Sequence, residues 1–176
     1  MIKLLIGFLF SLELFAGTLV LQSGSVQAHT ETMLGSEINP LNSKLSVEVN
    51  IEDLKFETMS GQFWVEMNLF KSDEEDRDKN MYESLHSASF KLATFSIFSV
   101  SKASEVDMYD ISGKLSFHGI ERDLTAKAKI TVDTKKISFH ATSMINMPDY
   151  GIEMPCMLFI CVRDQVDLVV QATFSQ

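Results

Sequence analysis

Hydrophobic and polar residues alternate along most of the chain after Pro40, with a period of two. This period is typical of a β-strand that buries one face and exposes the other to water. The alternation is strictest over residues 124–132, and it recurs at residues 45–52, 63–69, 95–97, 115–118, 137–141 and 166–174. Roughly eight strands with short connections predict an all-β fold, an antiparallel barrel that is closed or nearly closed, because closure leaves no strand edge exposed.

Residues 72–85 depart from this period and predict a short helix. Ser72 is expected to cap the helix, and Glu75, three residues later, would complete a capping box. The acidic residues 73–75 would also lie at the positive end of the helix dipole. Met81 and Leu85 are four residues apart and would share the buried face. We expect this helix to cross the barrel or to cover one of its ends.

The first 28 residues have the features of a secretory signal peptide. Lys3 precedes an apolar run over residues 4–21. In residues 25–28, small or aliphatic side chains lie three residues and one residue before the expected cut, the positions that signal peptidase recognises. We expect cleavage after Ala28, which gives a barrel domain of residues 29–176 that is periplasmic or secreted, without a permanent membrane anchor. A retained anchor is the alternative, and it would bury Glu13 in hydrocarbon at a cost of about 3 kcal/mol.

Composition and charge narrow the possible functions. The 176 residues suffice for one ordinary domain, and 45% hydrophobic residues exclude a disordered chain. The net charge of −9 argues against a nucleic-acid partner and against electrostatic docking onto anionic lipid, since both require a basic face. The common catalytic motifs are absent from the sequence, so we expect a protein that is not an enzyme and uses no cofactor.

Metal binding remains an alternative at two positions. After cleavage, His29 would be the N-terminal residue and could chelate copper through its amino group and ring, as in the histidine brace of some secreted copper proteins. Cys156 and Cys161 lie among several methionines, which are soft ligands suited to Cu(I). On an extended strand these two cysteines would be about 16 Å apart, so a disulfide requires the residues between them to form a turn.

Small side chains gather on the predicted inward face of the barrel, at Gly113, Ala126, Ala128, Ala141 and Ala172. An eight-stranded barrel either fills its interior with side chains or holds one small ligand. In the second case the expected lining is uncharged and consists of Phe95, Ile97, Leu115, Phe117, Ala126, Ala128, Phe139, Ala141 and Leu168. In the first case, the helix around Met81 and Leu85 would fill the space. The alternation leaves both open.

Three segments, in this order, resemble the YceI-like family, a lipocalin-like group of exported bacterial proteins. Residues 77–85 and 89–95 are similar to the family's acidic helix and the strand that follows it, although Lys91 replaces the usual proline. Residues 112–122 (SGKLSFHGIER) resemble the family's G-x-L-T-x-H/A-G-V hairpin. Residues 147–155 (MPDYGIEMP) resemble its D-Y/F-G-I turn, with the closing strand after them.

The resemblance implies an antiparallel eight-stranded lipocalin-like barrel, with one short helix beside an elongated apolar cavity. It also implies binding of a polyisoprenoid lipid or quinone rather than a reaction. We therefore expect an exported carrier whose partner is a hydrophobic small molecule held in the barrel interior. The alternatives are a periplasmic metal-handling protein that uses His29 or the Met/Cys cluster, and a stress-related structural module with a filled barrel.

Overall fold

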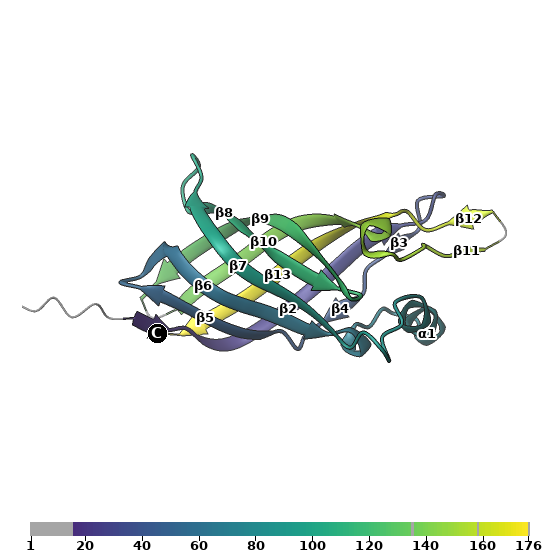
Figure 1. Cartoon of the computed structure of the whole chain (residues 1–176), viewed down its shortest axis with the longest axis horizontal. Helices are drawn as coiled ribbons and strands as arrows, with labels where there is room; N and C mark the ends of the chain where they lie inside the picture. Colours follow the sequence, from purple (N-terminus) through teal and green to yellow (C-terminus); the bar gives the residue numbers. More distant parts are fainter. Residues whose placement is uncertain (1–15, 135, 158, 176) are drawn as a thin grey trace, which may run out of the picture.

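The computed structural model describes residues 16–134, 136–157 and 159–175, which form a curled antiparallel sheet and one short α-helix (Figure 1). The long strands of the described chain are β5 (Ser46–Glu52), β6 (Lys55–Glu66), β7 (Leu92–Lys102), β8 (Met108–Phe117), β9 (Ile120–Asp133), β10 (Lys136–Asn146), β13 (Gln165–Ser175) and β2 (Val20–Glu31). They are neighbours in this order. The predicted fold class, an all-β antiparallel eight-stranded lipocalin-like barrel with one short helix, is confirmed: the eight long strands form a curled antiparallel sheet.

Short elements complete the fold at the two ends of the sheet. They are the strands β1 (Ala16–Thr18), β3 (Glu37–Ile38), β4 (Leu41–Asn42), β11 (Cys156–Met157) and β12 (Ile160–Cys161), the 3₁₀ turns η1 (Met67–Leu69) and η2 (Met147–Tyr150), and the helix α1 (Glu75–Ser84). The α1 helix and the β11–β12 hairpin lie at the same end of the sheet, opposite the β5–β6 and β7–β8 turns (Figure 1). Among the described residues, no helix is both long and apolar enough to cross a bilayer.

The N-terminal segment brings the two edges of the sheet together. β1 pairs with β5, whereas β2 pairs with β13, and Leu19 alone separates β1 from β2. Further along β2, a side chain built at Gly24 would come within 2.9 Å of Leu45, just before β5. The curled sheet is therefore nearly closed at this edge, so fewer backbone N–H and C=O groups of the edge strands are left unpaired.

The structure differs from the sequence-based expectation in where the sheet begins. Residues 1–15 of the expected signal peptide lie outside the described residues. Residues 20–28, the last part of the expected signal peptide, form most of β2, where Val20 pairs with Ser175 and Ala28 with Leu168. Val26 is buried in the core. Cleavage after Ala28 would therefore remove most of a strand that pairs along the length of β13.

Strand β9 shows how the period of two directs side chains. Ala128 and Ile130 are buried, whereas Lys127 and Lys129, which alternate with them, are exposed. The turn to β8 consists of His118 and Gly119, with φ of +50° and +76°. Two positive φ values give a tight turn whose twist matches that of the strands. The predicted alternation is confirmed at Ala128 and Ile130 but not at Val132, at the end of the predicted run, which is 50% exposed.

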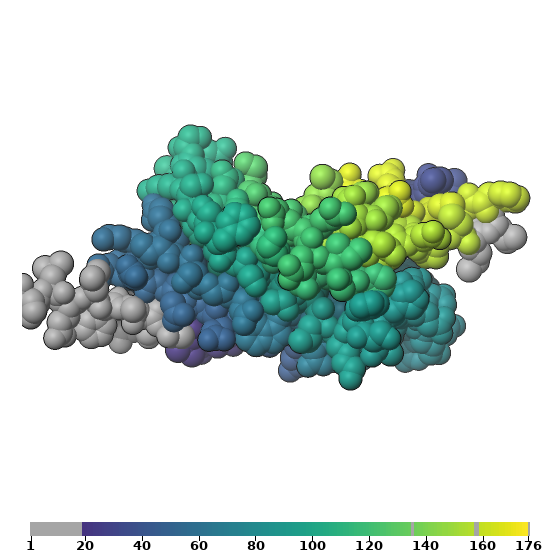
Figure 2. Space-filling view, viewed as in Figure 1, coloured from purple at the N-terminus to yellow at the C-terminus, as the bar shows by residue number. Residues whose placement is uncertain are grey.

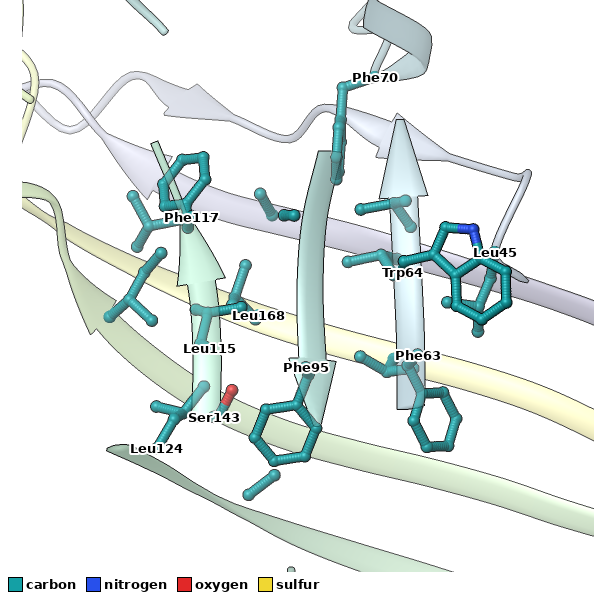
Figure 3. Close-up of a pocket in the computed structure, with 18 of the residues that line it drawn as sticks. Leu45, Phe63, Trp64, Phe70, Phe95, Leu115, Phe117, Leu124, Ser143 and Leu168 are labelled. Carbon is teal, nitrogen blue, oxygen red and sulfur yellow. The ribbon is translucent and has the colours of Figure 1, made fainter. Parts of the chain in front are cut away.

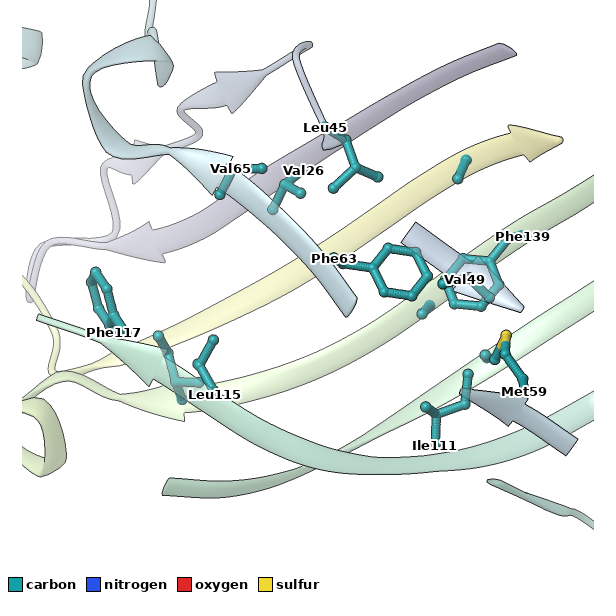
Figure 4. Close-up of a cluster of buried hydrophobic side chains, with 14 of the residues drawn as sticks. Val26, Leu45, Val49, Met59, Phe63, Val65, Ile111, Leu115, Phe117 and Phe139 are labelled. Carbon is teal, nitrogen blue, oxygen red and sulfur yellow. The ribbon is translucent and has the colours of Figure 1, made fainter. Parts of the chain in front are cut away.

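The interior is solid at the end of the sheet that carries the β5–β6 turn. Buried side chains there include Val49, Ile51, Phe56, Met59, Tyr109, Ile137 and Phe174. Towards the middle of the sheet, the rings of Phe63 on β6 and Phe139 on β10 stack with their centroids 5.5 Å apart and their planes 24° apart (Figure 4). This pair spans the interior and separates the filled end from the end near α1.

Candidate functional site

An apolar cavity of about 170 Å³ lies inside the curled sheet, with Phe63 and Phe139 in its lining at one end and Met81 of α1 at the other. Figure 3 shows part of the lining, including Phe63, Phe95 and Leu115. Its walls are almost entirely carbon, and Ser143 carries the one hydroxyl group among the described lining residues. A single buried water needs only about 10–15 Å³ and two or more polar partners, so this space is large for water and chemically unsuited to it. The cavity suits an apolar guest.

Seven of the nine residues expected to line a ligand space do line this cavity: Phe95, Leu115, Phe117, Ala126, Phe139, Ala141 and Leu168. Ala128 does not line the cavity. Its side chain is fully buried in the core, and its cross-strand neighbours are Tyr109 on one side and Ala141 on the other. Ile97 is partly buried against the core and also lies outside the cavity lining. Contact of these residues with a ligand stays a prediction.

The small inward residues have two different roles. Ala126 and Ala141 leave room in the wall of the cavity. Gly113 instead accommodates an aromatic ring, because a Cβ atom there would come within 2.4 Å of the Phe95 ring. Ala172 is packed in the core. The free space therefore comes from the alanines, while the space at Gly113 is taken by Phe95.

The α1 helix covers one side of the open end of the cavity. Met81 and Leu85 line the cavity, as expected for the buried face of the helix. The predicted capping box is absent, because the helix starts at Glu75 and its N-cap, Glu74, makes no side-chain cap. Instead, the buried carboxylate of Asp78 accepts a hydrogen bond of 2.7 Å from the backbone N–H of Ser72. This bond fixes the loop that leads into α1.

A second contact fastens α1 to the sheet. The Tyr82 hydroxyl donates a hydrogen bond of 2.5 Å to the backbone carbonyl of Phe70, which lies directly after η1. Burial raises the pKa of Tyr82, and the nearby Asp78 carboxylate raises it further, so the hydroxyl remains protonated and able to donate at neutral pH. The helix is thus held as a fixed cover over one side of the cavity end.

Sequence reasoning missed the contribution of β6 to the cavity wall. Phe63 and Val65 on this strand line the cavity, together with Phe70 after η1. Their alternation was visible in the sequence. The alternation predicts that these residues form a strand. It does not predict which part of the interior the strand faces, because that depends on how far the sheet curls.

The inner cavity opens into a larger outer one, which we call the vestibule. The vestibule has a volume of about 730 Å³ and lies between α1 and the β2–β3 and β11–β12 hairpins. Residues common to both spaces are Ala28, Pro40, Met81, Leu85, Met147 and Val166. Figure 2 shows α1 and the hairpins as separate lobes at this end of the molecule. The cavity is therefore closed at the Phe63–Phe139 pair and open towards the vestibule.

The two sides of the vestibule differ in charge. The hairpin side presents the apolar residues Leu34, Ile160 and Val162 together with the hydroxyl groups of Thr30, Thr32 and Ser36, and its described lining residues carry no charge. The α1 side presents Asn80, Glu83 and the Arg77 side chain, which pairs with Asp73 at 2.7 Å and with Glu74 at 3.0 Å. A molecule with a polar end and an apolar chain would find matching surroundings in the vestibule and the inner cavity, respectively.

A histidine pair connects the end of α1 to the β8–β9 turn. Nδ1 of His118 lies 2.9 Å from the carbonyl oxygen of Tyr150, so this nitrogen donates a hydrogen. The other nitrogen of the His118 ring, Nε2, lies 3.1 Å from Nδ1 of His86, within hydrogen-bond distance. The two ring planes are only 21° apart with centroids at 5.3 Å, as expected when two rings meet nitrogen to nitrogen. This geometry serves a hydrogen bond, since the two nitrogens point at each other rather than at a shared metal ion.

The residues of the metal-binding alternative are engaged in other contacts. Cys156 and Cys161 form a disulfide across the β11–β12 hairpin, because the chain between them turns back. Their sulfurs are therefore not available as thiolate ligands. His29 lies within β2, with Nδ1 2.6 Å from Oδ1 of Asn39, and this hydrogen bond raises its pKa. In the described parts of the chain, no three potential ligands among His, Cys, Asp and Glu lie close enough to share a metal ion.

Comparison with known proteins identifies one family and several related structures. A model of the YceI-like domain matches residues 18–174. The BcnA protein of Burkholderia cenocepacia has a similar structure, with a TM-score of 0.76 and 16% identity over 85% of this chain and 95% of that protein. No curated protein sequence matches the chain.

Two further structures share this architecture. A domain from Saccharophagus degradans, described as polyisoprenoid-binding, has a TM-score of 0.67 and 12% identity over 90% of this chain and 97% of that domain. The YceI protein of Campylobacter jejuni has a TM-score of 0.65 and 16% identity over 77% of this chain and 82% of that protein. At these identities the likeness is one of fold.

Proposed function

Because the chain belongs to the YceI-like family, we propose that the protein is an exported carrier that shields one long apolar molecule, of the polyisoprenoid or quinone type, inside its curled sheet. The observation that supports this proposal is the apolar cavity, which is closed at the Phe63–Phe139 pair and opens into the vestibule. A blind apolar channel suits a chain that enters end first. The polyisoprenoid-binding domain of Saccharophagus degradans has the same fold and provides a precedent for this class of ligand.

The energy of binding would come from removing hydrocarbon from water. The inner cavity of about 170 Å³ is close in size to one that holds a benzene molecule, so most of a long chain would lie in the vestibule of about 730 Å³. Burial of about 400 Å² of apolar surface over the two spaces, at about 25 cal/mol per Å², contributes about 10 kcal/mol before the costs of association. The rings of Phe95 and Phe117 offer flat surfaces for the branched, unsaturated units of an isoprenoid. The polar end of the molecule would remain in the vestibule, beside the polar residues of α1.

The chemistry of the wall favours binding over catalysis. Among the described residues that line the inner cavity, none has a titratable side chain. A hydrolytic or transfer reaction requires a nucleophile, an acid or base, or a metal that points at the reacting atoms. We therefore infer a binding role without a reaction.

Export is part of the same proposal. The Cys156–Cys161 disulfide is of the kind that persists in oxidising compartments, such as the periplasm or the cell exterior. The apolar run that follows Lys3 supports recognition by the secretion machinery. Since residues 20–28 belong to β2, we infer that a removed segment ends before Val20 rather than at Ala28.

Extraction of the native protein tests this function. Protein purified from its exported fraction without detergent, extracted with organic solvent and analysed by mass spectrometry, should yield close to one isoprenoid molecule per chain. Bulk phospholipids measured in the same extract control for membrane contamination, since a contaminant would reproduce the composition of the host membrane. Two results would overturn the proposal: an extract without stoichiometric lipid, or a stoichiometric transition metal found by elemental analysis.

A further inference from the structure

Four large apolar side chains are exposed together at the vestibule end of the molecule. They are Met33 (65% exposed) and Leu34 (74%) in the β2–β3 turn, and Phe159 (98%) and Ile160 (39%) in the β11–β12 hairpin. We call these four residues the apolar tip. Scattered single apolar residues are normal on a protein surface, but a cluster of them commonly marks an interaction site.

The two hairpins hold the apolar tip in a fixed arrangement. The backbone N–H of Met33 donates a hydrogen bond of 2.9 Å to the carbonyl of Cys161, and Thr32 forms a β-bridge with Val162. The Cys156–Cys161 disulfide closes the base of the β11–β12 hairpin. The two turns therefore project from the same end of the sheet (Figure 1). Little conformational entropy would be lost when this surface meets a partner.

The apolar tip borders the vestibule and is free of charge. Leu34 and Ile160 line the vestibule, so the tip forms one rim of the path into the cavity. Residues 32–36 and 154–162 contain no Asp, Glu, Lys or Arg. The charged residues that directly flank these two stretches are Glu31, Glu37, Glu153 and Arg163. Glu31 and Arg163 form an ion pair of 2.9 Å, and Glu37 accepts a hydrogen bond from Asn39. The tip itself can thus enter an apolar medium without carrying a charge, provided that insertion is shallow enough to leave Glu37 and Glu153 in water.

We propose that the apolar tip inserts into the surface of a zwitterionic phospholipid bilayer, so that the vestibule opens against the membrane. This inference rests on the proposed function, because a membrane is the source or destination of an isoprenoid. A stable protein–protein interface usually requires about 20–30 residues on each side. The four side chains of the tip are few for such an interface, but they are sufficient for shallow insertion into a lipid layer.

The charge of the molecule indicates which bilayer would be preferred. The chain has a net charge of −9, and α1 beside the vestibule begins with Glu75, Asp76 and Asp78. These carboxylates would be repelled by anionic lipids. Binding should therefore be strongest to zwitterionic vesicles, should weaken when anionic lipid is added, and should persist in high salt.

Flotation of the exported protein with phosphatidylcholine–phosphatidylethanolamine vesicles tests the inference. We expect the wild type to float with the vesicles and the double variant Leu34→Ser/Phe159→Ser to bind at least about ten-fold more weakly, since each lost apolar contact removes burial energy. The matched control is Phe98→Ser/Val106→Ser, which alters residues that are 61% and 83% exposed but lie outside the vestibule lining. This control should bind like the wild type.

Three outcomes would overturn the inference: no flotation of the wild type, equal binding by the tip variant and the wild type, or a dimer in sedimentation experiments that dissociates only in the tip variant. The lipid extracted from each protein separates this test from that of the proposed function. A lipid-loaded protein whose tip variant still floats refutes membrane docking alone. A lipid-free protein that floats through its tip refutes the carrier function and leaves docking intact.

Discussion

Replacing Ala126 with Phe should leave the protein folded and deprive it of its apolar cargo. Ala126 lines the inner cavity from β9 and pairs across the sheet with Ile111 on β8, which also lines the cavity. A phenylalanine ring at this position would enter the space that the proposed guest occupies. Because the ring would fill a cavity rather than a packed core, the cost of overpacking should stay near the low end of the usual range of about 1–3 kcal/mol.

The measurement is the amount of lipid extracted per chain, which we expect to fall below one tenth of the wild-type value. The matched control is Lys127→Phe, one residue further along β9, where the side chain is exposed on the outer face. Its ion pair with Asp110 at 3.5 Å is exposed and weak, so its loss should matter little. Wild-type lipid content in a folded Ala126→Phe protein would show that the cargo does not occupy the cavity.

A chain that begins at His29 should fail to fold, whereas one that begins at Ala16 should fold normally. The shorter chain lacks the part of β2 that pairs with β13 from Leu168 to Ser175. It also loses the buried side chains of Leu19 and Val26. Burial of two such side chains contributes about 3–6 kcal/mol, a large part of the roughly 5–15 kcal/mol that stabilises a typical domain.

Thermal unfolding followed by circular dichroism compares the two chains under identical conditions. We expect a cooperative transition for the Ala16 chain and none for the His29 chain. The N-terminus of the exported protein, read by intact mass, gives an independent comparison. Equal melting temperatures, or an exported and folded protein that starts at His29, would show that β2 is dispensable.

The difference at the N-terminus has a physical origin in the sequence. A signal peptide requires an apolar run followed by small residues at the cleavage site, and residues 4–28 satisfy that pattern. Residues 20–28 nevertheless form most of β2. The distinction depends on β13, which lies more than 100 residues away in the sequence and supplies the hydrogen-bonding partner of β2. A local pattern carries no signal for such a distant pairing.

The residues that line the interior could be predicted only in part, because the alternation is local and the closure of the sheet is not. Alternation on β8, β9 and β10 correctly identified the inward positions Leu115, Ala126 and Phe139, because the period of two is a local property. It also placed Ala128 correctly on the inward face, where the side chain is fully buried, but the cavity does not extend to that position. Side-chain sizes along one strand do not reveal how tightly the opposite strands close over it.

The disulfide and the start of α1 are two further features that depend on local backbone geometry. Cys156 and Cys161 can bond because the residues between them form a hairpin turn, which the apolar sequence CMLFIC did not indicate. Ser72 was a reasonable cap by spacing, but Asp78 competes for the same loop by accepting a hydrogen bond from the Ser72 N–H. The helix consequently starts at Glu75. In both cases the contact that forms, the disulfide or the Ser72–Asp78 hydrogen bond, depends on how the chain folds, which residue spacing alone does not determine.

The most direct test of the carrier account is the electron density inside the curled sheet, in crystals of protein purified gently and without detergent. The account predicts a continuous elongated density that starts beside Phe63 and Phe139, passes Leu115 and Leu168, and reaches the vestibule at Met81. An interior closed by the protein's own side chains, or one that contains only discrete water molecules, would contradict it.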